Sequence, residues 1–353
     1  MVLAKGTGAI LSRKEKDVAK KILITGGSGF IGYFVAKALS AEKSNTVTII
    51  DDLSRGVMDA DFETLIARDN VHFIQAYLTD RNVLSGLQDD YDYVYHFAAI
   101  IGVKNVTENP DKVLYVNALT ALNLFEYAKA SKAVKKIYFA STSEVYAGSL
   151  RHGCIDFPTN EEVVLAIDDI HANRTTYAVS KIFGESAALV YGRKYDIPVT
   201  VGRYHNIYGP RMGCAHVIPE TFFKIAHNTI IDVPSPTHTR AFCFIDDAVE
   251  FTIRACECSA AKNEIVHIGN RQEEVSVRDL VMTIARVMGK NITINELPDT
   301  PGSPIRRCPD TSKVEKLTGY QARISLEEGV RRSYEWYKEK LINTEDRETC
   351  QHS

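Results

Sequence analysis

The chain has 353 residues, of which 45% are hydrophobic and 25% charged, and its formal net charge is -3. This length allows two domains, or one large domain with an added lobe. The weak net charge gives no reason to expect nucleic acid or an acidic membrane surface as a partner. No apolar run approaches the ~20 residues that span a bilayer, so no membrane association is expected. Cys256 and Cys258 have no second pair and no nearby histidines, so no metal site is expected.

Residues 1–20 are interpreted as an N-terminal extension. The stretch contains Arg13, Lys14 and Lys16 but lacks the continuous apolar segment of a secretion signal. A cytoplasmic location is therefore expected.

The stretch from Lys21 to Gly32, KILITGGSGFIG, has the pattern of a strand, a tight turn and the start of a helix. Lys21 to Thr25 is a short apolar run, and three glycines follow at three-residue intervals. Glycine lets the backbone turn sharply and lets a pyrophosphate approach the free N–H groups of the helix that follows. The pattern predicts a dinucleotide site with these contacts: Gly26, Gly29, Phe30, Ile31 and Gly32.

A second strand, Thr46 to Ile50, is β-branched and apolar and leads directly into Asp51 and Asp52. A carboxylate at this strand end accepts hydrogen bonds from ribose hydroxyls and repels a 2′-phosphate, which favours NAD over NADP. The alternative is that Asp51 or Asp52 only caps a helix or turn.

Strand and helix patterns alternate through the first half of the chain. Further strands are expected at 71–75, 93–97, 136–141 and 199–204, and apolar residues recur at helical spacing over 109–130. This alternation predicts an α/β fold with a Rossmann-type doubly wound parallel sheet. The cofactor would lie above the rim formed by the strand ends.

Candidate catalytic residues follow the fifth strand. It ends in Ser141, Thr142, Ser143 and Glu144, and Tyr177 follows later with Lys181 four residues beyond it. Residues four apart share a helix face, so the phenol and the ammonium would meet. The ammonium is expected to lower the Tyr177 pKa and make the phenolate a usable base, while Thr142 or Ser143 holds the substrate oxygen and a hydride leaves for nicotinamide.

Several motifs together give the sequence a clear resemblance to the extended short-chain dehydrogenase/reductase family, in particular its nucleotide-sugar epimerases, dehydratases and decarboxylases. The resemblance covers about Lys21 to Tyr337. Its motifs are the glycine turn, Asp51 to Ser54, His96 to Ala99, the strand end with Tyr177 and Lys181, Arg203 to Arg211, Thr239 to Phe242, and Arg306 to Asp310.

The resemblance implies a tightly held NAD that oxidises a sugar of a nucleoside diphosphate sugar, usually at C4, to a 4-keto intermediate. It assigns Tyr177 as the base, Lys181 as the residue that binds the nicotinamide ribose and tunes the tyrosine, and Thr142 as an assisting hydroxyl. Where relatives have an aspartate that contacts adenine, this chain has Tyr77. Further cofactor contacts are expected from Ser54, Tyr77, Leu78 and Ala98.

The net reaction depends on residues beside the 4-keto sugar. Dehydratases of the family have an acid where this chain has Ser143, so 4,6-dehydration is disfavoured. Decarboxylases of nucleotide-linked glucuronate resemble the Thr142-Ser143-Glu144 pattern and have an arginine at the position of Arg174. The resemblance thus favours decarboxylation, with Glu144 orienting the uronate and Arg307 meeting its carboxylate or supplying a proton. A 4-epimerase and a 4-dehydrogenase are the alternatives, and so are structural roles for Glu144 and Arg174.

The second half of the chain is expected to form a smaller substrate-binding lobe. Guanidinium groups pair bidentately with phosphate oxygens, and the family motifs imply substrate contacts from Arg174, Asn206, Arg211, Arg240 and Arg307. A non-catalytic NAD-binding scaffold of the same fold is the competing function; loss of Tyr177 or Lys181 would indicate it, and both are present.

The expected organisation is an NAD-binding domain at 21–204, a nucleotide-sugar lobe at 205–341 with some segments returning to the first domain, and a polar tail at 342–353. An insertion at 148–173 is interpreted as lid-like or merely exposed. A homodimer or higher homo-oligomer is expected, in which the helices near Val116 and after Tyr177 pack against their copies, as in the enzymes that the chain resembles. The alternative is that these helices pack only against their own sheet.

Overall fold

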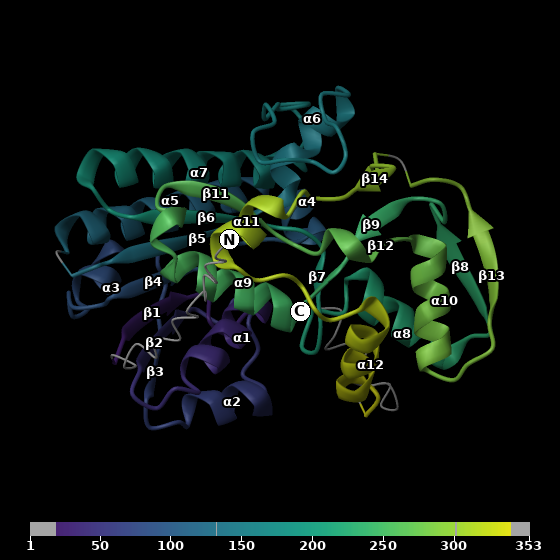
Figure 1. Cartoon of the computed structure of the whole chain (residues 1–353), viewed down its shortest axis with the longest axis horizontal. Coiled ribbons are helices and arrows are strands. Elements are labelled where there is room, and N and C mark those ends of the chain that lie inside the picture. The colour runs from purple at the N-terminus through teal and green to yellow at the C-terminus, as the bar shows by residue number, and fades with distance from the viewer. Residues whose placement is uncertain (1–18, 132, 301, 340–353) are drawn as a thin grey trace, which may run out of the picture.

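The structure, a computed structural model, describes residues 19–131, 133–300 and 302–339. Most of the expected N-terminal extension and all of the expected tail at 342–353 lie outside these residues. Figure 1 shows a sheet with helices on both faces and, beside it, a smaller lobe. Within the described residues, no helix has both the length and the apolar character needed to cross a membrane.

The central sheet has seven strands, all parallel, in the order β11-β6-β5-β4-β1-β2-β3. This order reverses between β1 and β4, which creates the crevice where ligands bind in doubly wound sheets. The predicted Rossmann-type fold is therefore confirmed. The strands are β1 (Lys21–Thr25), β2 (Thr46–Asp51), β3 (Val71–Gln75), β4 (Tyr93–His96), β5 (Lys136–Thr142), β6 (Val199–Tyr204) and β11 (Glu264–Ile268).

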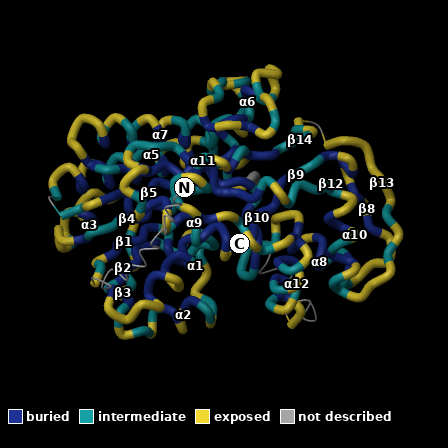
Figure 2. Tube along the Cα trace, in the orientation of Figure 1, coloured by how far each residue is buried: buried dark blue, intermediate teal, exposed yellow. Residues whose placement is uncertain are grey.

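The strands are buried on both faces because helices cover both sides of the sheet, and Figure 2 shows this buried centre in dark blue. One hydrophobic core contains α1 and α9 and continues into the lobe, and another lies under α5 and α7. The helices of this part are α1 (Phe30–Leu39), α2 (Ala60–Ile66), α3 (Arg81–Ser85), α4 (Val103–Glu108), α5 (Pro110–Ala130), α6 (Ala147–Arg151), α7 (Thr175–Tyr195), α9 (Ile245–Glu257) and α11 (Ser312–Thr318), with the 3-10 turn η1 (Ser143–Tyr146).

The smaller lobe is built from three short sheets and three helices. β13 pairs with β8, β9 lies between β12 and β14, and β10 pairs with β7. The bounds are β7 (Ile207–Tyr208), α8 (Val217–His227), β8 (Ile230–Pro234), β9 (Thr239–Ala241), β10 (Cys243–Phe244), β12 (Glu274–Ser276), α10 (Val277–Val287), β13 (Thr293–Leu297), β14 (Arg306–Arg307) and α12 (Leu326–Tyr337), with η3 (Arg271–Glu273). The turn η2 (Ser259–Ala261) follows α9 beside the central sheet, where the Ala261 carbonyl accepts from Thr200 Oγ1 of β6.

The second half of the chain crosses between the two parts more often than its sequence pattern indicates. The apolar run at 242–245 predicts a strand, but only Cys243–Phe244 is extended, and Ile245 starts α9. This helix packs under the central sheet beside α1, and β11 then joins the sheet next to β6. Tertiary packing thus uses the apolar residues of α9 as a helix face.

Candidate active site

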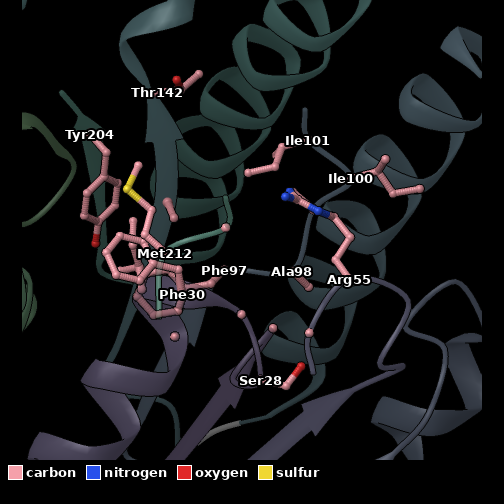
Figure 3. A pocket seen from close by; sticks show the side chains of 18 of the residues that line it. Ser28, Phe30, Arg55, Phe97, Ala98, Ile100, Ile101, Thr142, Tyr204 and Met212 are labelled. Carbon is pink, nitrogen blue, oxygen red and sulfur yellow. The ribbon is translucent and has the colours of Figure 1, made fainter. Parts of the chain in front are cut away.

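A cavity of about 960 Å³ lies at the carboxyl ends of the central strands, between the sheet and the smaller lobe. This size matches that of ligand pockets. Its walls come from both parts of the chain, and Figure 3 shows Phe30 and Phe97 of the first part facing Met212 of the second. The cavity therefore gathers the strand ends that the sequence predicts to carry the chemistry.

The glycine turn closes one end of the cavity. Gly26 has a left-handed backbone (φ 74°), and a Cβ there would lie 2.5 Å from the Ala98 nitrogen. A Cβ on Gly32 would lie 2.2 Å from the Gly26 oxygen. Only glycine fits at these positions, so the turn packs tightly and α1 starts directly beside it. This is a cradle that fits a pyrophosphate.

Asp51 fixes the geometry of this end of the cavity. Its carboxylate accepts hydrogen bonds from the backbone N–H of Ser28 at 3.0 Å and of Leu53 at 2.9 Å. Asp52 accepts from the Ser54 N–H at 2.8 Å. Each carboxylate keeps lone pairs for ribose hydroxyls. The predicted role of Asp51 toward a ribose stays a prediction, and the structure adds a role in holding the turn.

The other predicted cofactor residues also line the cavity. Tyr77 is 66% exposed, whereas Leu78 is buried. The Leu78 carbonyl is held by the Asn123 side-chain amide at 2.8 Å. The full predicted set found in the cavity wall is Gly26, Gly29, Phe30, Ile31, Gly32, Asp51, Asp52, Ser54, Tyr77, Leu78, Ala98, Tyr177 and Lys181.

Thr142 and Tyr177 come together at the end of β5, although Tyr177 belongs to α7. Burial, followed by the charge of Glu144, raises the pKa of the Tyr177 phenol above its ordinary value, whereas hydrogen bonding with Thr142 acts in the opposite direction. The predicted lowering of the Tyr177 pKa is therefore wrong for the protein chain by itself. The raised pKa favours the protonated phenol at neutral pH in the protein chain by itself.

Lys181 lies in the same wall, but its ammonium is directed to the sheet. Its Nζ donates to the Ala140 carbonyl at 2.9 Å and lies 5.3 Å from the centre of the Phe139 ring. Because the side chain is buried, its pKa falls to about 8. The expected close pairing of this ammonium with the phenol is replaced by a contact with β5, which explains why the tyrosine pKa is not depressed.

Three arginines act electrostatically on Glu144, which lines the cavity together with one of them, Arg307. Glu144 Oε1 accepts from Arg307 Nη1 at 2.5 Å. Burial disfavours its charge, but Arg307, Arg174 and Arg240 together hold the pKa of Glu144 below its ordinary value. Burial and the charge of Arg307 lower the Arg240 pKa to about 10. Three guanidinium groups against one carboxylate leave an excess of positive charge.

The remaining residues that are predicted to contact the substrate differ in exposure and in the hydrogen bonds that they already make within the protein. Arg174 is exposed and lies beside Gly302, and Asn206 lines the cavity while its amide donates to the Ala241 carbonyl at 3.1 Å. Arg240 donates to Thr239 O at 2.7 Å and to Ser303 Oγ at 3.0 Å. Ser143 is buried and also lines the cavity.

Arg211 lines the cavity, but its guanidinium already has partners within the protein. Its Nε pairs with Asp59 at 2.8 Å, and its two terminal nitrogens donate to Ser28 O at 2.8 Å and Val57 O at 2.9 Å. The guanidinium also lies 4.4 Å from the centre of the Tyr33 ring. Its nitrogens are engaged, so Arg211 fastens the segment after β7 to the cofactor domain, and its predicted substrate contact stays a prediction.

The insertion at 148–173 packs against the segment that carries Arg307. Thr159 N donates to Cys308 O at 2.8 Å, Asp310 N donates to Thr159 O at 2.6 Å, and the Arg306 guanidinium lies 5.2 Å from the centre of the Phe157 ring. None of its residues, all of which are described, lines the large cavity. The insertion therefore supports the wall behind Arg307.

Arg55 is a site residue that the sequence interpretation missed. Figure 3 shows its side chain reaching into the cavity near Ile101, from the loop that follows β2. A Cβ on the next residue, Gly56, would lie 1.6 Å from the Ser28 Oγ, so the loop rests directly on the glycine turn. Burial lowers the pKa of the Arg55 guanidinium. The sequence does contain an arginine four residues after Asp51, but a single arginine in a loop is more often a surface charge and so does not by itself predict a site residue.

Within the described residues, no group of three or more His, Cys, Asp or Glu side chains could hold a metal ion. The walls of the cavity contain the glycine turn, the carboxylate of Asp51 and the guanidinium of Arg55. These groups suit a negatively charged dinucleotide. Tyr177 and Lys181 also line the cavity, near Glu144 and its arginine neighbours. The fold and the site together define a dinucleotide-dependent enzyme with an active-site tyrosine.

Comparison with known proteins identifies the family. The model of the NAD dependent epimerase/dehydratase family matches residues 22–269, so the chain belongs to that family. It is an NAD-dependent enzyme of sugar nucleotides.

Relatives are similar along nearly their whole length. The chain is 31% identical over 331 residues to a UDP-N-acetyl-alpha-D-glucosaminuronate decarboxylase from Bacillus cytotoxicus, covering 91% of this chain and 98% of the relative. It is 29% identical to UDP-glucuronic acid decarboxylase 6 from Arabidopsis thaliana, covering 88% and 86%. Among solved structures, the UDP-glucuronic acid 4-epimerase from Bacillus cereus in complex with UDP-glucuronic acid and NAD has a TM-score of 0.80 at 28% identity, covering 91% and 99%.

Proposed function

We propose that the protein decarboxylates a nucleoside diphosphate uronate, with UDP-glucuronate or its N-acetylated amino-sugar analogue as the substrate. The observation that carries this proposal is the excess of guanidinium charge around Glu144, from Arg307, Arg240 and Arg174. A diphosphate and a sugar carboxylate bring negative charge to this end of the cavity, and guanidinium forks pair with both groups. The names of two relatives, both uronate decarboxylases, support the same substrate class.

Each residue of the site has a separate role in the proposed reaction. NAD, when bound, would supply the hydride acceptor for oxidation at C4 and would return the same hydride to C4 after CO2 has left. Tyr177 and Thr142 hold the C4 oxygen. The positive charge of a bound nicotinamide ring beside the phenol would favour its deprotonated form, and in that form Tyr177 takes the hydroxyl proton as the C4 oxygen becomes a carbonyl. A carboxylate β to a ketone loses CO2 readily, and the electrons left behind place negative charge on the C4 oxygen. The Tyr177 phenol, whose pKa is raised in the protein by itself, is suited to return a proton to that oxygen.

In this proposal, Glu144 and Arg307 face the carboxylate on C5 of the sugar, next to the C4 oxygen that Tyr177 holds. Because Arg307 already pairs with Glu144, the carboxylate of the substrate meets a guanidinium that is partly neutralised. The negative charge of Glu144 also disfavours the substrate carboxylate more than it disfavours neutral CO2. This arrangement favours loss of the carboxylate charge during decarboxylation.

A uronate 4-epimerase is the second candidate, because a structural neighbour with that activity was solved with UDP-glucuronic acid. Both activities begin with C4 oxidation, and they differ in whether the carboxylate is lost. A 4-dehydrogenase that releases the keto sugar remains an alternative. A 4,6-dehydratase is disfavoured because the hydroxyl of Ser143 is too weak an acid for that reaction.

Incubation with UDP-glucuronate and with UDP-N-acetylglucosaminuronate, followed by product analysis, tests the proposal. We expect CO2 and a UDP-pentose from at least one of them. A C4 epimer with the carboxylate intact would instead establish the second candidate. In the Tyr177→Phe variant, turnover should fall by orders of magnitude while NAD is retained; unchanged turnover would contradict the role of Tyr177.

The homodimer is likewise a proposal, supported by apolar side chains exposed on α5 and α7. Tyr115 is 63% exposed, Phe183 41% and Val190 46%. Burying such a face against its copy would form a four-helix interface. We expect Phe183→Glu to shift the mass in light scattering from dimer to monomer. Val164→Glu, on the exposed insertion, should leave it unchanged, and a wild-type monomer would refute the dimer. The cytoplasmic location stays a prediction.

A further inference from the structure

A second, much smaller cavity lies next to Arg307. Its volume is about 10 Å³, and its wall includes Ser143, Tyr146, His205, Arg307 and Cys308. Ser143 and Arg307 also line the large cavity, so they separate the two spaces. A space of this size accommodates one water, provided that polar groups surround it.

Unpaired polar atoms are concentrated in this wall. Both ring nitrogens of His205 and the Nε of Arg307 are buried and have no hydrogen-bond partner among the described residues. His205 is only 3% exposed. Buried polar atoms in proteins nearly always have a protein or water partner, so three orphaned atoms at one small cavity indicate a ligand.

Tyr146 and His267, the aromatic neighbours of His205, cannot supply these partners. The Tyr146 hydroxyl already accepts from Arg203 Nη1 at 2.5 Å and contacts His267 Nε2 at 2.7 Å. The other His267 nitrogen faces the Asp310 carbonyl at 2.9 Å, so it carries the proton, and Nε2 accepts from Tyr146. The Tyr146 oxygen therefore has its proton committed to His267. His205 and Arg307 must be satisfied through the cavity.

The charge state of His205 specifies the donors and acceptors. Burial and the neighbouring His267, Arg307 and Arg203 lower the pKa of His205 well below its ordinary value, so the ring is neutral. A neutral imidazole has one N–H and one bare nitrogen, and the Arg307 Nε–H is only a donor. A water accepts from Arg307 and donates to the bare nitrogen of His205, with Ser143 available for a third bond.

The geometry points to a resident water that joins His205 to Arg307 Nε and thereby orients the Arg307 guanidinium for the substrate carboxylate. Arg307 is then held at two places, by Glu144 at Nη1 and by the water at Nε. Its second terminal nitrogen stays available to the large cavity. His205 is in this view a positioning residue, since it acts through Arg307. The consequence for substrate choice rests on the proposed function.

The test uses the full chain with the Tyr177→Phe substitution, so that ligands bind without turnover. Crystallography at a resolution that shows ordered waters should reveal a peak between His205 and Arg307. Calorimetry then gives the affinities for UDP-glucuronate and UDP-glucose. His205→Phe removes the acceptor and fills the cavity, so we expect roughly tenfold weaker binding of the uronate and unchanged binding of UDP-glucose.

His205→Gln is the matched variant, because its amide retains a donor and an acceptor; it should keep most of the preference for the uronate. NAD retention and the melting temperature report whether each variant is folded. An empty cavity in well-ordered density would overturn the water site. An unchanged ratio of the two affinities in a folded His205→Phe protein would overturn the positioning role. If the parent protein has no preference for the uronate, the proposed function is wrong, and the density still decides the water site.

Discussion

Lys181 carries an electrostatic cost that sets a pH dependence of stability. Its side chain is buried, and its folded-state pKa of about 8 lies below the ordinary 10.5. Between these two values the unfolded chain binds more protons than the folded protein does, so this residue makes stability rise with pH across that window. Below about pH 8 the cost is fully present, because both states are protonated.

Replacement of this lysine makes the dependence measurable. We expect Lys181→Met to be more stable than the wild type at neutral pH, by up to about 3 kcal/mol, and the gap to shrink as the pH rises from about 8 to 10.5. Denaturant unfolding of both proteins at several pH values checks this expectation. Every other titratable group is present in both proteins, so the difference between them reports on Lys181. A constant difference would show that the Lys181 pKa is not depressed.

Arg55 is the second residue with a chemical role that its position specifies. Its guanidinium reaches into the dinucleotide cavity, and its loop rests on the glycine turn. We expect Arg55→Gln to weaken the binding of NAD and ADP-ribose by roughly tenfold, because a charge-assisted phosphate contact is lost, and to leave adenosine binding unchanged.

Calorimetry with these three ligands measures the effect, and Arg193→Gln, at the exposed end of α7, is the control. Equal weakening for adenosine would indicate that Arg55 contacts the nucleoside and not the phosphates.

At the scale of elements, the position of α7 on β5 determines where the catalytic side chains lie. Gly184 is buried in α7, and a Cβ there would lie 2.4 Å from Cζ of Phe139. The glycine thus permits a close approach of helix and strand, one turn after Lys181. Short sequence patterns predicted the existence of both elements, but this approach depends on side chains 45 residues apart in the sequence.

We expect Gly184→Ala to destabilise the protein by about 1–3 kcal/mol, because the added methyl overpacks the contact with Phe139. Ser186→Ala, at an exposed position of the same helix, should change the stability little. Thermal or denaturant unfolding compares the two. Equal stability of both variants would mean that the ring of Phe139 moves aside freely.

At the scale of the whole molecule, Arg211 joins the segment after β7 to the cofactor domain. Its side chain is 5% exposed and binds Asp59, while the same guanidinium holds the carbonyls of Ser28 and Val57. These partners belong to the glycine turn and to the loop that carries Arg55. The contact therefore couples the lobe to the coenzyme site.

Removal of this contact should weaken both stability and coenzyme binding. We expect Arg211→Gln to lower the free energy of unfolding by on the order of 3 kcal/mol, since it leaves Asp59 and two carbonyls without their partner, and to raise the dissociation constant of NAD. Arg254→Gln, which breaks the exposed pair with Glu250, is the control and should have little effect. A variant with normal stability and NAD affinity would show that the two parts are held together elsewhere.

Local sequence determined the parts of this protein that depend on local physics. The apolar strands, the glycine turn, the acid after β2 and the Tyr177-Lys181 step are each specified by a few neighbouring residues, and motifs of this kind led to the family and to NAD. Tertiary structure decided how distant residues share their charges and hydrogen bonds. It directed Lys181 to Ala140 O, turned Arg211 into a clamp, placed Arg55 in the cavity and brought Arg307 to Glu144. These outcomes depend on distances in space that no spacing along the chain encodes.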